Sequence, residues 1–202
     1  MTSDDNTVNM KPRDGRYHHG DLRSALIEEG LAQLDVKAPD AVSLREIARN
    51  VGVSATAVYR HFPDKAALLN ALCGVGGERL AEAFREAMTG ATDQREAFKA
   101  MGRAYVKFAL RNPSVFRLMM TQRPPEGDRN ETPSVTDEPF GMLSDTLNSL
   151  MPADASKTDR KIKRLQAWSM VHGLAMLMLD GQVPPDEVLV DQVIVASFLE
   201  TD

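Results

Sequence analysis

The side chains best suited to chemistry lie close together between positions 59 and 65. Tyr59, His61 and Lys65 offer a phenol, an imidazole and an ammonium, and Arg45 adds a guanidinium upstream. All four groups donate hydrogen bonds, and the lysine and arginine are cationic. Donors of this kind bind phosphate oxygens well, so the cluster indicates a phosphate-bearing partner.

Two short predicted helices must position these donors. The first helix has an apolar stripe at the i, i+3, i+4, i+7 spacing of one helix face, formed by Leu44, Ile47, Ala48 and Val51. Gly52 tolerates positive φ and ends that helix, and Ser54 caps the next one. Val58 and Phe62 give the second helix its own apolar face. The pattern is typical of a helix-turn-helix, whose second helix enters the DNA major groove.

Phosphate contacts are also expected at three predicted helix N-termini, because unpaired N–H groups there attract anions. These termini follow the capping residues Ser43, Ser54 and Asp64.

Base contacts are expected from the first turn of the second helix, which consists of Ser54, Ala55, Thr56 and Ala57. The Thr56 methyl suits a thymine methyl, but none of these side chains reads a base with two hydrogen bonds. Discrimination is therefore left to three alternatives: Arg60, a minor-groove contact by the basic arm (Lys11, Arg13 and Arg16), or DNA shape.

The charge distribution is compatible with this interpretation although the net charge is −5. Residues 11–65 carry nine Lys or Arg against eight Asp or Glu, whereas residues 66–202 carry fifteen against nineteen. A locally basic face on an acidic chain favours a specific DNA-binding protein over a nonspecific coat protein.

The rest of the chain predicts an all-α protein of about nine helices, with no strand or repeat. The apolar runs are too short to span a membrane, the N-terminus has no signal-peptide core, and the single Cys73 suits a reducing compartment, so a cytoplasmic location is expected. Thr121 to Pro139 holds four prolines and predicts a long loop, which is a lid, a docking site or only a disordered segment.

The chain resembles the tetracycline-repressor (TetR) family of transcriptional regulators. The resemblance is strongest over Tyr17 to Leu72, in YHHGDLRSALIEEGLAQL and VSLREIARNVGVSATAVYRHFPDKAALLNAL. A shorter match, AWSMVHGLAMLMLDGQV at Ala167 to Val183, is similar to a ligand-domain type in that family with Trp, His and Gly. The resemblance assigns phosphate contact to Tyr59, His61 and Lys65. The predicted DNA-binding residues are therefore Ser43, Arg45, Ser54, Ala55, Thr56, Ala57, Tyr59, Arg60, His61 and Lys65.

The resemblance also implies three parts. Residues 1–16 form a disordered, basic-ended arm and residues 17–64 the three-helix DNA-binding domain. A long fourth helix then opens a helical effector-binding and dimerisation domain over residues 65–202. Gly74, Gly76 and Gly77 interrupt the apolar pattern of that fourth helix, which predicts a kink or close packing there.

A small apolar effector is expected because the family's C-terminal domain commonly binds one, and because most of the eleven methionines lie in this half. The predicted lining residues are Met101, Tyr105, Phe108, Phe116, Met119, Trp168 and His172. Trp168 and His172 share one helix face, and His172 would be a rare polar contact.

The last two helices are expected to form a homodimer interface, so that two recognition helices read a pseudo-palindrome. One predicted stripe consists of Ile162, Leu165, Ser169, Gly173, Ala175 and Leu179. The second consists of Leu189, Val193 and Phe198. Effector binding would displace the fourth helix and change the spacing of the recognition helices.

Other classes of protein fit less well. Cys73 has no neighbouring histidine and no nucleophile–base pair stands out, so no enzyme is expected. The adjacent His18 and His19 lack the spacing of two helical ligands, so neither a metal nor another cofactor is expected. The main alternative is a DNA-binding dimer that a partner protein controls through the Thr121–Pro139 loop, without a small ligand.

Overall fold

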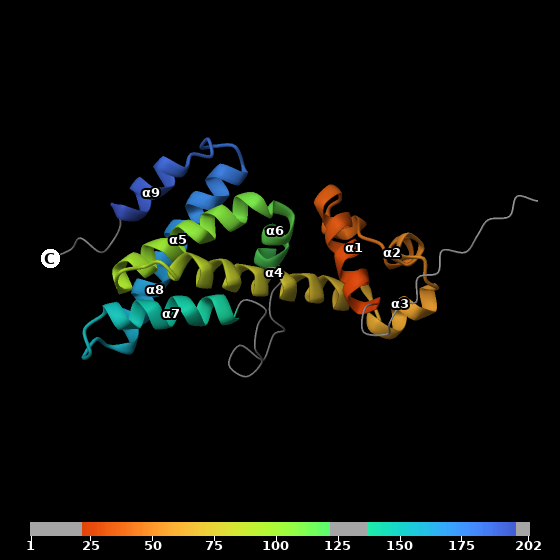
Figure 1. The fold of residues 1–202 in the computed structure, drawn as a ribbon, viewed down its shortest axis with the longest axis horizontal. Coiled ribbons are helices and arrows are strands. Elements are labelled where there is room, and N and C mark those ends of the chain that lie inside the picture. The colour runs from red at the N-terminus through yellow and green to blue at the C-terminus, as the bar shows by residue number, and fades with distance from the viewer. Residues whose placement is uncertain (1–21, 122–136, 197–202) are drawn as a thin grey trace, which may run out of the picture.

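The computed structural model describes residues 22–121 and 137–196, and within these ranges it contains nine α-helices, one short 3-10 helix and no strand (Figure 1). The predicted all-α fold is confirmed. The predicted arm at residues 1–16, Phe198 and most of the predicted Thr121–Pro139 loop lie outside the described residues.

Four elements form one end of the molecule (Figure 1): α1 (Leu22–Val36), the 3-10 helix η1 (Pro39–Ala41), α2 (Leu44–Val51) and α3 (Ala55–His61). The predicted boundaries of the helix pair are confirmed. Ser43 Oγ accepts a hydrogen bond from the Glu46 amide, and Ser54 Oγ accepts one from the Ala57 amide. Gly52 ends α2 at φ 81°, a left-handed conformation that favours glycine.

Helix α4 (Lys65–Met88) connects this end to the remaining helices. Asp64 caps it by accepting the Ala67 amide at 2.8 Å. The helix runs without interruption through Gly74, Gly76 and Gly77. At Gly76 the structure shows why a glycine is needed. A Cβ added at Gly76 would lie 2.5 Å from Met119 Sδ and 2.9 Å from Val115 Cγ2. Close packing, the second of the two expectations for this segment, therefore accounts for Gly76.

The other end of the molecule consists of α5 (Gln94–Arg111), α6 (Pro113–Thr121), α7 (Asp137–Leu150), α8 (Lys157–Leu179) and α9 (Glu187–Val195). Helix α7 begins at Asp137, so the last three residues of the predicted Thr121–Pro139 loop are helical. Pro139 lies in the first turn of α7, where its missing N–H breaks no helical hydrogen bond.

The buried side chains of both ends belong to one continuous hydrophobic core. Helix α1 joins it by close approach to α4, because a Cβ at Gly30 would lie 3.1 Å from Leu72 Cδ2. Helix α6 packs against both α1 and α4. The helix-turn-helix end is thus supported by α4 and α6 rather than standing apart.

Candidate nucleic-acid interface and aromatic cluster

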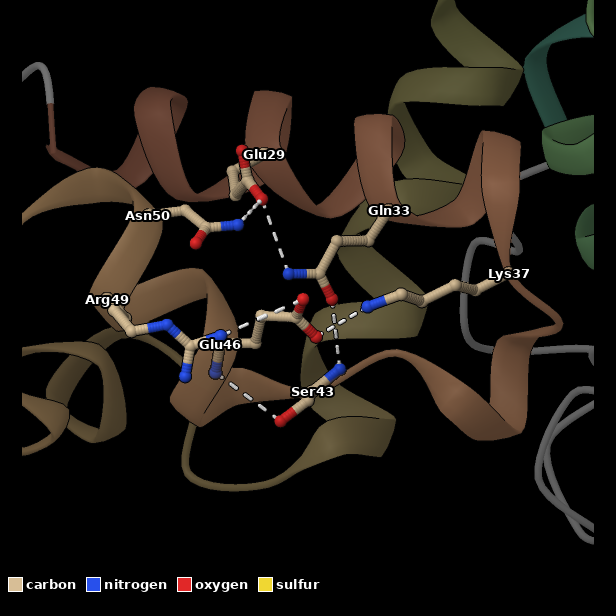
Figure 2. A network of polar contacts seen from close by, with 7 residues as sticks. All are labelled: Glu29, Gln33, Lys37, Ser43, Glu46, Arg49 and Asn50. Carbon is tan, nitrogen blue, oxygen red and sulfur yellow. Dashed lines mark hydrogen bonds and ion pairs between the residues drawn. The ribbon is translucent and has the colours of Figure 1, made fainter.

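A polar network fixes α2 against α1 (Figure 2). Gln33, which is 4% exposed, accepts a hydrogen bond from the Ser43 amide and donates one to Glu29 Oε1. Asn50 Nδ2 donates to the same Glu29 oxygen at 2.7 Å. These bonds satisfy a buried amide side chain and tie both ends of α2 to α1, so the first helix of the motif is held in one position.

An ion pair closes the other side of this network (Figure 2). Lys37 Nζ lies 2.5 Å from Glu46 Oε2, and Arg49 lies 3.9 Å from the other oxygen of Glu46. The hydrogen bond from Lys37 holds the pKa of the Glu46 carboxyl below its usual value. Glu46 therefore pairs closely with Lys37 and more loosely with Arg49.

Helix α3 presents its predicted contact residues on the outer surface. Val58 is fully buried and Phe62 is 2% exposed, whereas Tyr59 is 44% exposed. The exposed neighbours on and before α3 are Ser54, Ala55, Thr56 and Arg60, and the half-buried ones are Ala57 and His61. Tyr59 is thus not part of the core, and its hydroxyl is accessible to an external acceptor.

The remaining predicted contacts differ in how they are held. Arg45 is exposed on α2, whereas Ser43 is half-buried. The half-buried Lys65 donates from Nζ to the Asp40 carbonyl oxygen at 2.5 Å. An ammonium has three N–H donors, so two stay available beyond this bond. The bond attaches the start of α4 to η1.

One feature of this end escaped the sequence analysis. Arg23, in the first turn of α1, lies with its guanidinium carbon 5.5 Å from the centre of the Phe62 ring. No sequence signal marks this contact, because residues 23 and 62 belong to different helices.

At the other end, four of the predicted effector-lining residues form a cluster of rings, which we call the aromatic cluster: Tyr105, Phe116, Trp168 and His172. Tyr105 meets Phe116 edge to face with ring centres 5.5 Å apart, and Phe116 lies 5.8 Å from His172. Trp168 lies 6.0 Å from His172 on the same helix. Three separate helices therefore contribute to one site.

Hydrogen bonds run through the aromatic cluster. Trp168 Nε1 donates to the Tyr105 hydroxyl at 3.2 Å, and that oxygen lies 3.0 Å from His172 Nδ1. If the hydroxyl donates its own hydrogen to Nδ1, every group in this chain is satisfied and the His172 proton lies on Nε2. Burial lowers the pKa of His172 and raises that of Tyr105 to about 12, so both groups are neutral near pH 7.

The other predicted lining residues are core residues on α5 and α6. Met101, Phe108 and Met119 are 2%, 6% and 3% exposed, and Met119 packs on Gly76. Phe140 was not predicted for this site, yet its ring centre lies 6.1 Å from that of Trp168. Their large sequence separation hides this contact.

Helix α8 presents an apolar outer face, though not the stripe expected. Ile162, Leu165 and Leu177 are 49%, 55% and 47% exposed, and a Cβ at Gly173 would meet nothing within 4 Å. Ala175 is 0% exposed, so its expected place on the outer stripe is wrong. Ala175 lies on the face of α8 that packs on the core, because residues two positions apart on an α-helix point in very different directions, and Gly173 and Leu177 lie on the outer face.

Residues 22–121 and 137–196 contain neither a cluster of metal ligands nor a membrane-spanning helix. No three or more His, Cys, Asp or Glu side chains gather there in a way that suits a metal ion, and none of the helices has the length and hydropathy needed to cross a membrane. Cys73 is fully buried, and burial raises the pKa of its thiol to about 11.

Comparisons with known proteins agree with this geometry. Residues 26–72 match the model for bacterial regulatory proteins of the tetR family, and residues 98–196 match the model for a tetracyclin repressor-like C-terminal domain. A protein of unknown function from Rhodococcus sp. RHA1 is 31% identical, with 91% of this chain and 94% of that chain covered and a TM-score of 0.75.

Two more distant structures share the fold. A tetR-family transcriptional regulator from Streptomyces coelicolor is 23% identical, with 88% of this chain and 79% of that chain covered and a TM-score of 0.66. The fatty acid degradation regulator FadR from Bacillus halodurans is 15% identical, with 87% and 98% covered and a TM-score of 0.65.

Proposed function

The chain belongs to the TetR family of bacterial regulatory proteins, and from this premise we propose that it is a repressor that a small apolar effector releases from a pseudo-palindromic operator. Membership makes it a DNA-binding transcriptional regulator with a helix-turn-helix. The effector, the repressor polarity and the individual contact residues are the proposal.

The proposal of DNA binding rests mainly on one observation: a fixed helix α3 whose outer side chains are exposed. Both capping serines and the α1–α2 network fix the motif, while Tyr59 and Arg60 stay exposed on its outer side. The proposed phosphate contacts are Ser43, Arg45, Tyr59, His61 and Lys65. The proposed base contacts are Ser54, Ala55, Thr56, Ala57 and Arg60.

The aromatic cluster supports an effector that is apolar and uncharged. Trp168 and His172 both contact the Tyr105 hydroxyl. In the tautomer that we propose, with the hydroxyl donating to Nδ1, His172 Nε2–H is the one donor of these three side chains with no partner in the described structure. A neutral N–H among aromatic rings favours a carbonyl or ether oxygen over a carboxylate, which would need a cation. Met101, Phe108, Phe116 and Met119 complete the proposed lining.

Helix α6 offers a route from this cluster to the DNA-binding end. Phe116 lies against Tyr105 and His172, while Val115 and Met119 of the same helix adjoin Gly76 of α4. Helix α6 also packs against α1. An effector that displaces Phe116 would therefore shift α6 against α4 and α1, and would change the separation of the two recognition helices.

Dimerisation through α8 and α9 is supported by exposed apolar side chains. Ile162, Leu165 and Leu177 of α8 and Val188 of α9 are all exposed in the protomer. Two copies of α8 can approach closely at Gly173. Pairing these faces would remove apolar area from water and place two copies of α3 for adjacent half-sites.

The first test is binding to the DNA upstream of the protein's own gene, against a scrambled duplex, by fluorescence anisotropy across a salt series. Wild type should prefer the upstream DNA, and the Tyr59→Ala/Lys65→Ala variant should bind both duplexes weakly. Arg79→Ala, an exposed change on α4, is the matched control. Equal binding of both duplexes that survives the double substitution would contradict the DNA-contact assignment.

The second test uses Trp168, the single tryptophan of the chain, as the reporter of effector binding. A neutral aromatic ketone such as acetophenone should quench its emission saturably, whereas benzoate should not. His172→Phe should weaken the ketone response. If no neutral ligand changes either emission or DNA affinity, control by a partner protein becomes the better account.

A further inference from the structure

We propose that Arg23 is an additional DNA-phosphate contact, held in place by the Phe62 ring at the end of the recognition helix. The inference rests on the proposed function, because it requires DNA to lie along α3. It adds a residue on α1 to a set otherwise drawn from α2, α3 and the start of α4.

Geometry is the first argument. The Arg23 guanidinium carbon lies 5.5 Å from the centre of the Phe62 ring, and Phe62 follows directly after His61, the last residue of α3. A guanidinium above an aromatic face keeps its N–H groups free at the edges of its plane. The contact thus holds a long, exposed side chain against the residue that follows α3, without using its donors.

The state of the other cations at this end is the second argument. Lys37 and Arg49 face Glu46, and Lys65 donates to the Asp40 carbonyl oxygen. Arg45 and Arg60 are exposed and already belong to the proposed contacts. Arg23 is exposed, and within residues 22–121 and 137–196 no carboxylate pairs with it. Its guanidinium therefore lies at the surface, without a carboxylate partner among these described residues.

Local helix stability does not explain an arginine at this position. Helix α1 has no acidic residue in its first turn, and Arg23 puts a cation there instead. A positive charge near a helix N-terminus is disfavoured by the helix dipole. An external anion would turn this unfavourable placement into a favourable one.

The test compares the full-length wild type with Arg23→Gln on a random-sequence 30-bp duplex, by fluorescence anisotropy at about 50 and about 200 mM salt. Each lost phosphate contact lowers the salt exponent by about 0.9. The affinity ratio of wild type to Arg23→Gln should therefore be about 3.5-fold larger at the lower salt for each bound protomer. Arg23→Lys should keep most of the wild-type salt dependence.

Arg79→Gln is the matched control, since Arg79 is exposed on α4 roughly 21 Å from Lys65 at the helical rise of 1.5 Å per residue. Its affinity ratio should not change with salt. If Arg23→Gln behaves like Arg79→Gln while wild type binds DNA in a salt-dependent way, the Arg23 assignment is wrong and the proposed function stands. If the wild type itself shows no salt-dependent DNA binding, both the proposed DNA interface and the Arg23 contact are wrong.

Discussion

At the DNA-binding end, the hydrogen bonds that hold the candidate contact residues span at most 25 residues, whereas those of the aromatic cluster join far more distant residues. There, Ser43 and Ser54 each cap a helix by accepting a hydrogen bond from the backbone amide three residues downstream. In the aromatic cluster, the bonds of Tyr105 reach Trp168 and His172, which are 63 and 67 residues away. The first end is therefore held within a short stretch of the chain, and the second depends on packing between distant parts of the C-terminal half.

The largest effects should come from one buried phenylalanine at each end. Phe62 and Phe116 are 2% and 0% exposed, so replacing either by Ala should cost about 3–5 kcal/mol in the free energy of unfolding, measured in urea by circular dichroism. Under conditions where both variants stay folded, Phe62→Ala should lose DNA affinity and Phe116→Ala should lose the effector response. Loss of DNA affinity in folded Phe116→Ala would mean that Phe116 also maintains the DNA-binding conformation.

A smaller effect is expected where α6 crosses α4. Gly76→Ala would push a methyl against Met119 Sδ and Val115 Cγ2 and should destabilise the protein by about 1–3 kcal/mol, seen as a lower Tm. Gly141→Ala in α7 meets nothing within 4 Å and should stabilise by about 0.5–1 kcal/mol. Gly76→Ala should also blunt the effector response while sparing DNA binding. An unchanged response would remove α6 from the proposed route.

Removing one tyrosine hydroxyl from each end should have opposite effects on stability and DNA binding. Tyr105→Phe leaves Trp168 Nε1 and His172 Nδ1 without their partner and should cost about 1–2 kcal/mol of stability, with a changed Trp168 emission. Tyr59→Phe removes an exposed hydroxyl and should change stability by less than about 0.5 kcal/mol, but it should weaken DNA binding. The opposite pattern would reverse the roles given to the two residues.

The smallest expected effect is a pH dependence confined to the aromatic cluster. Burial lowers the pKa of His172 from 6.5, so below that pH the unfolded chain takes up the proton first. Stability should be highest above pH 6.5 and fall as the pH drops toward the folded-state pKa. Urea unfolding from pH 8 to 5 measures this slope, and His172→Phe should reduce it. An identical slope in the variant would assign the dependence to other groups.

Much of the fold was predictable because its signals are local. Gly52, Ser54 and Asp64 mark helix ends through their own backbone preferences and short side chains, and all three occupy the expected positions. The start of α7 lies inside the predicted loop because Pro139, which is typical of loops, is also accepted in the first turn of a helix. Ala175 was assigned to the wrong face because small residues suit both a core and an interface.

The sequence alone determined the all-α class, the helix-turn-helix and the identity of its outward residues, because these depend on a 3.6-residue period and on caps within one turn. Only the tertiary structure decided that Arg23 lies over Phe62, that Gly76 receives α6, and that one tyrosine hydroxyl joins Trp168 to His172. Each of these contacts joins two helices. Their formation depends on how helices cross in space, which no pattern within a single helix records.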